Sequence, residues 1–252
     1  MITKIDILAI GAHPDDIELG CGGTILNEVH RGKKVGLIDL TAGELGTRGS
    51  VAKRKQESKK ASKILGVDFR LNLGMKDGFI KNDEKSQIEI IRYIRKYQPE
   101  IIICNAPDDR HIDHAEASKL VVSSSFLSGL VKIKTKLDNN NQNPWRPKNI
   151  YHYIQWKNLE PTFVVDISQH IVNKMEAVSS YDSQFYNPDS KEPETLISSE
   201  KFLDSITARS ADFGRLIGVE HAEGFISNKL VGVKSLNAVS YTHLTLPTKR
   251  IV

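Results

Sequence analysis

The sequence predicts an α/β fold: a Rossmann-like, mostly parallel sheet with helices on both faces, in a single domain. In the first half of the chain, short apolar runs such as 101–104 alternate with longer segments of helical periodicity, the pattern of strand–helix–strand units. The 252 residues include 39% hydrophobic and 26% charged residues, ordinary globular values that supply a full core. The sequence shows neither an internal repeat nor a linker-like stretch that would divide it.

The first half is expected to alternate strand and helix. An apolar run that stops at Gly11 is typical of a buried parallel strand. Gly66 and Pro99 follow two helical patterns and are residues that end helices, while Ser86 can cap the helix before Pro99. We expect strands at 5–10, 34–41, 70–73 and 101–104, and helices at 19–30, 51–65, 86–97 and 115–130.

The second half is less regular. We expect strands at 150–155 and 162–167, helices at 171–181 and 201–213, and loops at 42–50, 138–147 and 185–193. Residues 240–252 contain no acidic residue and no clear period. We therefore set them apart from a domain at 1–239, as sequence attached to the protein, such as a cloning or read-through scar. Their two basic residues account for half of the net charge of +4.

Composition excludes several classes of protein. The positive charges are interspersed with acids, which argues against a nucleic-acid partner. The apolar runs are too short to cross a bilayer, and the N-terminus lacks the apolar region of a signal peptide, so we expect no membrane partner and a cytoplasmic protein. Two cysteines, Cys21 and Cys104, exclude a disulfide-rich scaffold and a CxxC zinc module. We expect both to be small buried hydrophobic residues.

Two motifs rich in ionisable side chains follow two of the expected strands. Ala12-His13-Pro14-Asp15-Asp16 follows the first, and Asp109-Arg110-His111-Ile112-Asp113-His114 follows the strand at 101–104. Parallel strands bind ligands at their carboxyl ends, so the two motifs are expected to meet. Histidines with one carboxylate suit zinc and leave a fourth position for water. In a single such motif, either histidine could instead cap a helix or bond a loop carbonyl, but two motifs favour a metal site.

A metal site of this kind suits hydrolysis. Zinc lowers the pKa of a bound water to about 7, and Asp15 could accept the proton of that water. A hydrolase of another bond, such as a phosphoester, stays open, although a two-metal site would need more bridging carboxylates than these motifs supply. A Rossmann-like nucleotide-binding or non-catalytic module also stays open. Against it, Gly20-Cys21-Gly22-Gly23 does not have the GxGxxG spacing, and the ionisable cluster argues against a passive role.

Together the two motifs resemble those of the LmbE-like (PIG-L) family of zinc-dependent N-acetylglucosamine deacetylases. The resemblance extends from residue 5 to about residue 239. Three further segments carry it: Thr41-Ala42-Gly43-Glu44, Tyr181-Asp182-Ser183-Gln184-Phe185 and His221-Ala222-Glu223-Gly224-Phe225. The last two are most similar to the branch that removes acetyl from N-acetylglucosaminyl-malate in bacillithiol biosynthesis. The resemblance therefore implies the LmbE-like fold, a small-molecule N-acetylglucosaminide substrate and a homo-oligomer.

The resemblance also implies the roles of individual residues at the metal. His13, Asp16 and His114 would bind Zn²⁺, or Fe²⁺, since ligands of this kind accept both. Asp15 would be the general base and later pass its proton to the leaving amine. His111, oriented by Asp113, would help to stabilise the tetrahedral oxyanion.

The substrate-binding residues implied by the resemblance are basic or lie after the second strand. Arg110 is the candidate for the malate carboxylate, because a guanidinium matches a carboxylate in a bidentate way. Glu44 and Arg48 would lie near the sugar, and Arg146 near the site. One position departs from the family pattern. Some relatives use a tyrosine hydroxyl as an oxyanion donor where this chain has Phe202, so that donor is absent or comes from another residue, such as Tyr186.

Overall fold

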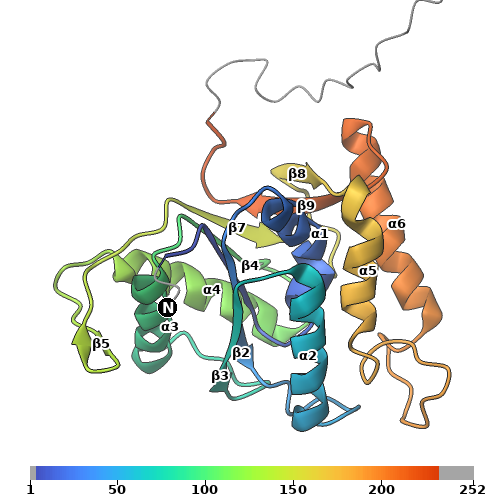
Figure 1. Ribbon diagram of the computed structural model, residues 1–252, viewed down its shortest axis with the longest axis horizontal. Helices are drawn as coiled ribbons and strands as arrows, with labels where there is room; N and C mark the ends of the chain where they lie inside the picture. Colours follow the sequence, from blue (N-terminus) through green and yellow to red (C-terminus); the bar gives the residue numbers. More distant parts are fainter. Residues whose placement is uncertain (1–3, 233–252) are drawn as a thin grey trace, which may run out of the picture.

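A seven-stranded sheet forms the centre of the molecule, in the order β3-β2-β1-β4-β7-β9-β8 (Figure 1). The computed structural model describes residues 4–232. The strands are β1 (Ile7–Gly11), β2 (Val35–Thr41), β3 (Phe69–Met75), β4 (Ile101–Asn105), β7 (Asn149–Tyr153), β8 (Phe163–Asp166) and β9 (Ala222–Ser227). Parallel pairs join β3 to β2, β2 to β1, β1 to β4 and β4 to β7, whereas β9 runs antiparallel to both β7 and β8. The predicted mostly parallel α/β sheet is confirmed.

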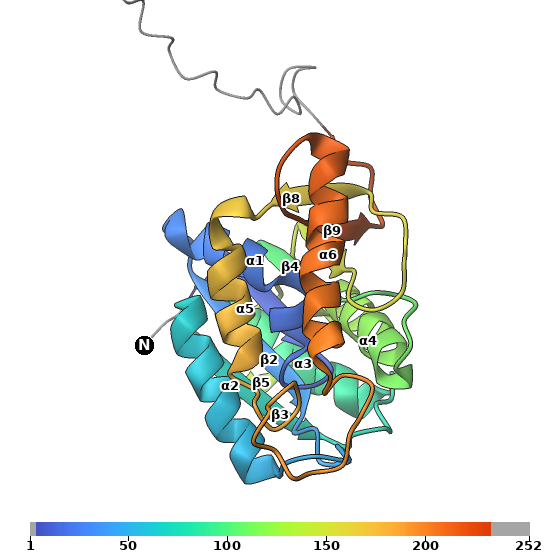
Figure 2. The same cartoon turned by 90° about the vertical axis from the view of Figure 1, so that its right-hand side faces the viewer.

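Helices cover both faces of this sheet. They are α1 (Asp16–His30), α2 (Val51–Leu65), α3 (Glu84–Tyr97), α4 (Ile112–Ser128), α5 (Ile171–Ser179) and α6 (Glu200–Ile217), with a short 3-10 turn, η1 (Ser168–His170), before α5. Helices α3 and α4 lie on one face, and α1, α2 and α5 on the other (Figures 1 and 2). Helix α6 packs beside β8 and β9 (Figure 2). No helix in the described range is long and apolar enough to cross a membrane.

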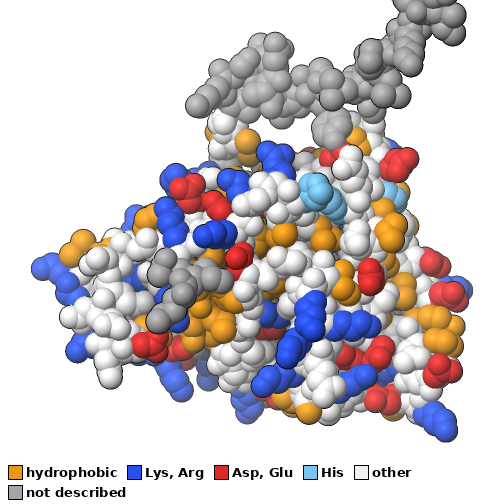
Figure 3. All heavy atoms as spheres, in the orientation of Figure 1, with side chains coloured by type: hydrophobic (Ala, Val, Ile, Leu, Met, Phe, Trp, Pro, Cys, Tyr) orange, Lys and Arg blue, Asp and Glu red, His pale blue; other side chains and the backbone are white. Residues whose placement is uncertain are grey.

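Alternating side chains of β1 supply both halves of the core. Leu8 and Ile10 pack toward α3 and α4, whereas Ile7 and Ala9 pack toward α1. All four are almost completely buried, as expected for a central parallel strand. Figure 3 shows basic and acidic side chains intermixed on the face of the molecule that it presents.

The glycine-rich segment after the first motif lies inside α1 and is a packing feature. A Cβ on Gly20 would lie 2.1 Å from the ring of Tyr153 in β7, so only glycine lets α1 approach the sheet this closely. Cys21 interrupts α1 with φ −148° and is completely buried, and Cys104 is buried in β4. The expectation that both cysteines are small buried residues is confirmed.

Three features differ from the sequence-based expectation. Strand β9 was not predicted, because its first residues, Ala-Glu-Gly, have low β-propensity and only tertiary pairing makes them a strand. Strands β5 (Lys136–Leu137) and β6 (Asn140–Asn141) form a small hairpin that extends into the expected loop at 138–147; Asp138 and Asn139 form its turn with positive φ. Helix α1 begins three residues earlier than predicted, and so does α4. The proposed boundary at 239 and the segment 240–252 lie outside the described residues.

Candidate active site

The two motifs meet at the carboxyl ends of β1 and β4. Asn105, the last residue of β4, joins them: its Oδ1 accepts a hydrogen bond from the Ala12 N–H at 2.9 Å, and its Nδ2 donates to Asp16 Oδ2 at 3.1 Å. The same Asp16 oxygen accepts from the His13 backbone N–H at 2.9 Å. Strand β1 has β2 on one side and β4 on the other, so the site occupies the switch point of the parallel sheet.

His13 is buried between carboxylates on both sides of its ring. Its Nδ1 lies 3.5 Å from Asp16, and its Nε2 lies 3.0 Å from Asp77 and 3.3 Å from Asp113. Asp77, which follows β3, is a site residue that the sequence analysis missed. The sequence did offer one signal, because Asp77 closely follows a third parallel strand. The predicted strand at 70–73 ended two residues too early for this position to be recognised.

Asp113 contacts two of the histidines through different groups. Its carboxylate contacts His13 and accepts hydrogen bonds from the backbone N–H groups of Gly78 at 2.6 Å and Ile80 at 3.4 Å. Among the described residues, the hydrogen bond between Asp113 and His111 comes from the backbone: the Asp113 N–H donates to His111 Nδ1 at 3.3 Å, which makes His111 the N-cap of α4. The Asp113 side chain therefore holds His13, while the start of α4 holds His111.

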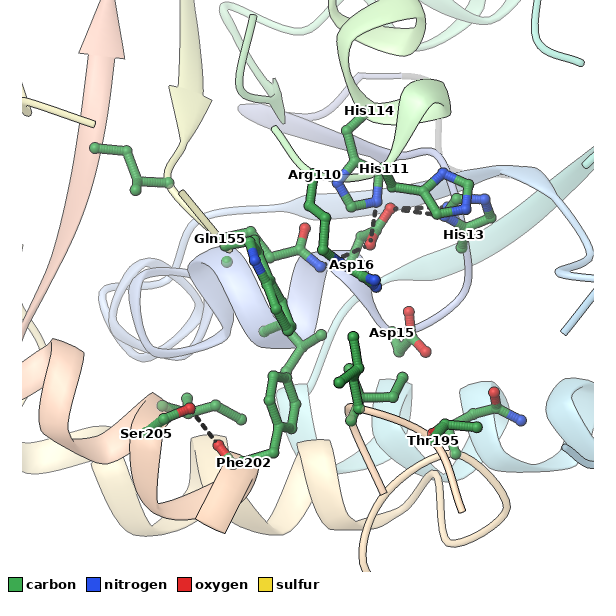
Figure 4. A pocket seen from close by; sticks show the side chains of 18 of the residues that line it. His13, Asp15, Asp16, Arg110, His111, His114, Gln155, Thr195, Phe202 and Ser205 are labelled. Atoms are coloured by element: carbon green, nitrogen blue, oxygen red, sulfur yellow. Dashed lines mark hydrogen bonds and ion pairs between the residues drawn. The ribbon is translucent and has the colours of Figure 1, made fainter. Parts of the chain in front are cut away.

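His114 completes the cluster from the first turn of α4. Its Nε2 lies 3.1 Å from Asp16 Oδ1, and its Nδ1 lies 2.9 Å from Asp109. Gln155, after β7, also donates to Asp16 Oδ1 at 2.8 Å. The rings of His13 and His111 meet edge to face with centroids 4.6 Å apart. Figure 4 shows the three imidazoles around the Asp16 carboxylate.

The donor set fits a divalent transition metal. Ring nitrogens of His13, His111 and His114 all lie within 4.8 Å of one another, and Asp16 contacts two of these rings. Burial lowers the pKa of His114, but Asp16 and Asp109 outweigh burial and raise its pKa to about 9. Burial likewise lowers the pKa of His13, but its three carboxylate neighbours raise that pKa well above the usual value. The carboxylates therefore create a negative potential where imidazoles converge, the environment that a Zn²⁺ or Fe²⁺ ion needs.

Asp15 stands beside this cluster in a strained backbone conformation. Its φ is +121°, which costs an L-residue on the order of 1–3 kcal/mol. Its carboxylate is buried and lies 3.3 Å from Nη2 of Arg54 in α2. Burial raises the pKa of Asp15 to about 7, while the Arg54 guanidinium acts in the opposite direction.

A cavity of about 640 Å³ opens in front of these residues. Its opposite wall comes from α6, where Phe202 faces the motif residues (Figure 4). Arg110 stacks on Trp156 at 4.4 Å from the ring centroid, and the Phe202 ring stacks on the same indole at 5.6 Å. Arg48 also lines the cavity; it donates to Ser190 Oγ at 2.6 Å. The structure thus combines an ionisable floor with an aromatic wall.

Two predicted substrate-binding residues do not line this cavity. Glu44 faces the Asp77 backbone, whose N–H donates to its carboxylate at 2.8 Å. Arg146 lies at the end of α4, where it donates to the Phe126 carbonyl at 2.9 Å and stacks on the Phe126 ring. Both predictions came from the family resemblance, and the local contacts of these side chains direct them elsewhere. Phe202 brings a ring without a hydroxyl to the site, and Tyr186 is not among the residues that line it.

Comparisons with known proteins identify the family. The model of the PIG-L family, described as GlcNAc-PI de-N-acetylase, matches residues 8–125. The diacetylchitobiose deacetylase of Thermococcus kodakarensis is 30% identical over 229 residues, which cover 86% of this chain and 81% of that protein. The chain belongs to the PIG-L family. The resemblance inferred from the two motifs is confirmed, and the chain is an enzyme of the deacetylase class.

Two further comparisons extend over most of the chain. The probable N-acetyl-alpha-D-glucosaminyl L-malate deacetylase 2 of Bacillus anthracis is 25% identical over 202 residues, covering 73% of this chain and 84% of that protein. The crystal structure of the conserved protein TT1542 from Thermus thermophilus superposes with a TM-score of 0.82 at 34% identity. That match covers 91% of this chain and 97% of the other.

Proposed function

We propose that this PIG-L enzyme is a metal-dependent deacetylase that hydrolyses the N-acetyl group of a small N-acetylglucosaminide. One observation carries the proposal: the side chains of His13, Asp16 and His114 converge beside the buried carboxylate of Asp15, on the floor of a cavity large enough for a substituted sugar. Hydrolysis of an amide needs an activated water and a group that moves its proton, and this cluster supplies candidates for both.

His13, Asp16 and His114 would hold the metal. A divalent ion bound there would polarise the acetyl carbonyl and lower the pKa of a bound water. Asp77 and Asp113 would fix the His13 ring from its Nε2 side, which leaves Nδ1 for the ion. Gln155 and Asn105 orient the Asp16 carboxylate through hydrogen bonds to its two oxygens.

Asp15 would move the proton. As the water oxygen bonds to the acetyl carbon, Asp15 takes a proton from that water. The bond from carbon to nitrogen then breaks, Asp15 returns the proton to the nitrogen, and acetic acid and a free amine leave. His111 would donate a hydrogen bond to the oxyanion: because its Nδ1 accepts from the Asp113 backbone, the neutral ring carries its proton on Nε2.

The finer proposal is that the substrate is N-acetylglucosaminyl-malate. Arg110 supports it, because its side chain lines the cavity, where it stacks on Trp156, and no salt bridge joins it to a carboxylate of the described residues. Malate would supply that carboxylate. The B. anthracis relative carries this substrate in its name, whereas the T. kodakarensis relative is named for diacetylchitobiose, whose second sugar would instead stack on Trp156 and Phe202.

The test is release of free amine from a panel of N-acetylglucosaminides by enzyme of known metal content. N-acetylglucosaminyl-malate should be the best substrate, ahead of diacetylchitobiose and free N-acetylglucosamine. A preference for diacetylchitobiose would reject malate but keep the deacetylase. Absence of amine release from the whole panel by metal-loaded enzyme would reject the proposal.

Two variants test the assigned roles. Asp15→Ala should keep the metal and lose most turnover, and His114→Ala should lose the metal. Near wild-type turnover in Asp15→Ala would show that the base is assigned wrongly.

A further inference from the structure

The Asp15 carboxylate forms an ion pair with a buried arginine of α2. Arg54 Nη2 lies 3.3 Å from Asp15 Oδ2, and this is the ion pair that the described residues give to Asp15. We infer that Arg54 is a positioning residue that fixes the Asp15 carboxylate for proton transfer, and that Gln184 in turn fixes Arg54. The inference rests on the proposed role of Asp15 as the base. It assigns a task to Arg54 and to the Tyr-Asp-Ser-Gln-Phe segment, which the mechanism above does not use.

Arg54 is built into the protein as a fixed group. It lies in the first turn of α2, is 7% exposed, and donates from Nη2 to the side-chain oxygen of Gln184. Its Nη1 lies 3.5 Å from the Gly43 carbonyl. A Cβ on Gly43 would lie 1.7 Å from Nη1, so the glycine makes room for the guanidinium. A planar guanidinium that is held at several nitrogens keeps one orientation. An arginine on the surface has no such contacts and changes its orientation.

Gln184 is oriented so that its oxygen faces Arg54. Its Nε2 donates to the Arg48 carbonyl at 2.8 Å and to Ser183 Oγ at 2.9 Å, which leaves Oε1 for the guanidinium. Ser183 is itself held by Glu57, whose two carboxylate oxygens accept from its N–H at 2.9 Å and its hydroxyl at 2.8 Å. Residues 54 and 57 lie on one face of α2, so this helix bonds both residues of the 183–184 segment.

The backbone at Asp15 explains why the carboxylate needs such support. With φ at +121°, Asp15 lies outside the regions that L-residues populate, so the conformation persists only where the surroundings impose it. The base must also lie within about 3 Å of the proton that it removes. A misplacement of about 1 Å can cost about 100-fold in rate. A fixed guanidinium therefore controls the geometry on which proton transfer depends.

The main test replaces Arg54 and compares kcat with KM on the best substrate of the panel. Arg54→Met should lower kcat by about 10–100-fold, leave KM within about twofold and keep the full metal content. Added guanidinium ion should restore part of the lost kcat. Lys55→Met, an exposed neighbour on the same helix, is the matched control and should match the wild type. A raised KM with unchanged kcat would make Arg54 a substrate contact and overturn the inference.

Two further measurements guard against simple misfolding. Arg54→Lys keeps the charge without the planar fork, so it should fold and still lose kcat; wild-type kcat in Arg54→Lys would overturn the role of the fork. Gln184→Leu should show part of the loss of kcat that is expected for Arg54→Met. In an Asp15→Asn background, Arg54→Met should cause no further loss of kcat, because the group that it positions is gone. An equal loss in both backgrounds would mean that Arg54 acts on something else.

A double-mutant cycle measured by protein stability, which does not depend on activity, separates this inference from the proposed function. The urea midpoints of the metal-free wild type, Arg54→Met, Asp15→Asn and the double variant should be non-additive, as expected for residues in contact. Non-additive midpoints without deacetylation of any panel substrate would reject the function but keep the contact on which the positioning rests. Additive midpoints would reject the positioning even if the enzyme deacetylates the panel.

Discussion

Asp15 combines a reactive carboxylate with a backbone conformation that the protein must impose. Replacing it by glycine removes the steric conflict at φ +121°, whereas replacing it by alanine keeps that conflict. Both substitutions remove the carboxylate and its contact with Arg54, so their difference isolates the backbone strain. We expect Asp15→Gly to be more stable than Asp15→Ala by about 1–2 kcal/mol in urea unfolding. Equal stabilities would mean that the conformation carries no strain.

Asp77 would act on the proposed metal site through its contact with His13. Because its carboxylate lies 3.0 Å from His13 Nε2, its removal should weaken the ligand and free the ring to rotate. We expect Asp77→Ala to lower zinc affinity by about 10–100-fold in competition with a chelator, and Asp77→Asn to lower it less, since an amide oxygen still accepts a hydrogen bond. Asp212→Asn, exposed on α6 and paired with Arg215, is the control. Unchanged affinity in Asp77→Ala would remove it from the site.

The sequence was sufficient for the residues that are grouped in short motifs. His13, Asp15 and Asp16 come together because one turn holds them, and the second motif joins them because parallel strands end at one edge of a sheet. Asp77, Arg54 and Gln184 could not be predicted in the same way. Asp77 is 64 residues from His13 in the sequence, Arg54 is 39 from Asp15, and Gln184 is 130 from Arg54. No local sequence pattern indicates contacts over such separations.

Helix α1 contains a break, and a side chain from β9 caps the part that follows it. At Cys21 the helical dihedrals fail, and Glu223 of β9 accepts the N–H groups of Gly23 at 2.9 Å and Thr24 at 2.7 Å, so it caps the second half of the helix. Lys174 of α5 pairs with Glu223 at 2.6 Å, with both side chains at most 3% exposed. The pair therefore links three elements at the wall of the cavity.

Glu223→Ala should be strongly destabilising. It leaves the Lys174 ammonium buried without its partner and uncaps the helix, and we expect a loss of about 3–5 kcal/mol in the free energy of unfolding. Glu100→Ala removes the exposed pair with Lys148 and should cost less than about 1 kcal/mol. A loss below about 1 kcal/mol in Glu223→Ala would show that the linkage contributes little.

Local sequence patterns predicted some helices and strands correctly and missed others. Helices α2 and α3 follow clear periodicity and end at a left-handed Gly66 and before Pro99, so their ends agree with the prediction or nearly so. Strand β9 was missed because Glu223 and Gly224 are poor strand formers, and it exists only because β7 and β8 pair with it on both sides.

For the whole molecule, the site predicts that metal binding stabilises the fold. The ligands come from segments after β1 and β4, so an ion joins parts of the chain that the unfolded state separates. At about 100 times its dissociation constant, zinc should add about 2.7 kcal/mol and raise the Tm over that of chelator-treated protein. His114→Ala should show no such rise. A Tm that does not respond to zinc in the wild type would contradict a specific site.

The position of β9 also governs the order in which the protein can be completed on the ribosome. Residues 222–227 insert between β7 and β8, both of which are synthesised more than fifty residues earlier. Until β9 has left the exit tunnel, the nascent chain carries two strands with unpaired edges, which are templates for aggregation. The N-terminal half contains both histidine- and aspartate-rich motifs, and it can pair its strands long before that point. The helix capped by Glu223 stays incomplete until β9 arrives, so a nascent chain can bring the two motifs together before its active site is finished.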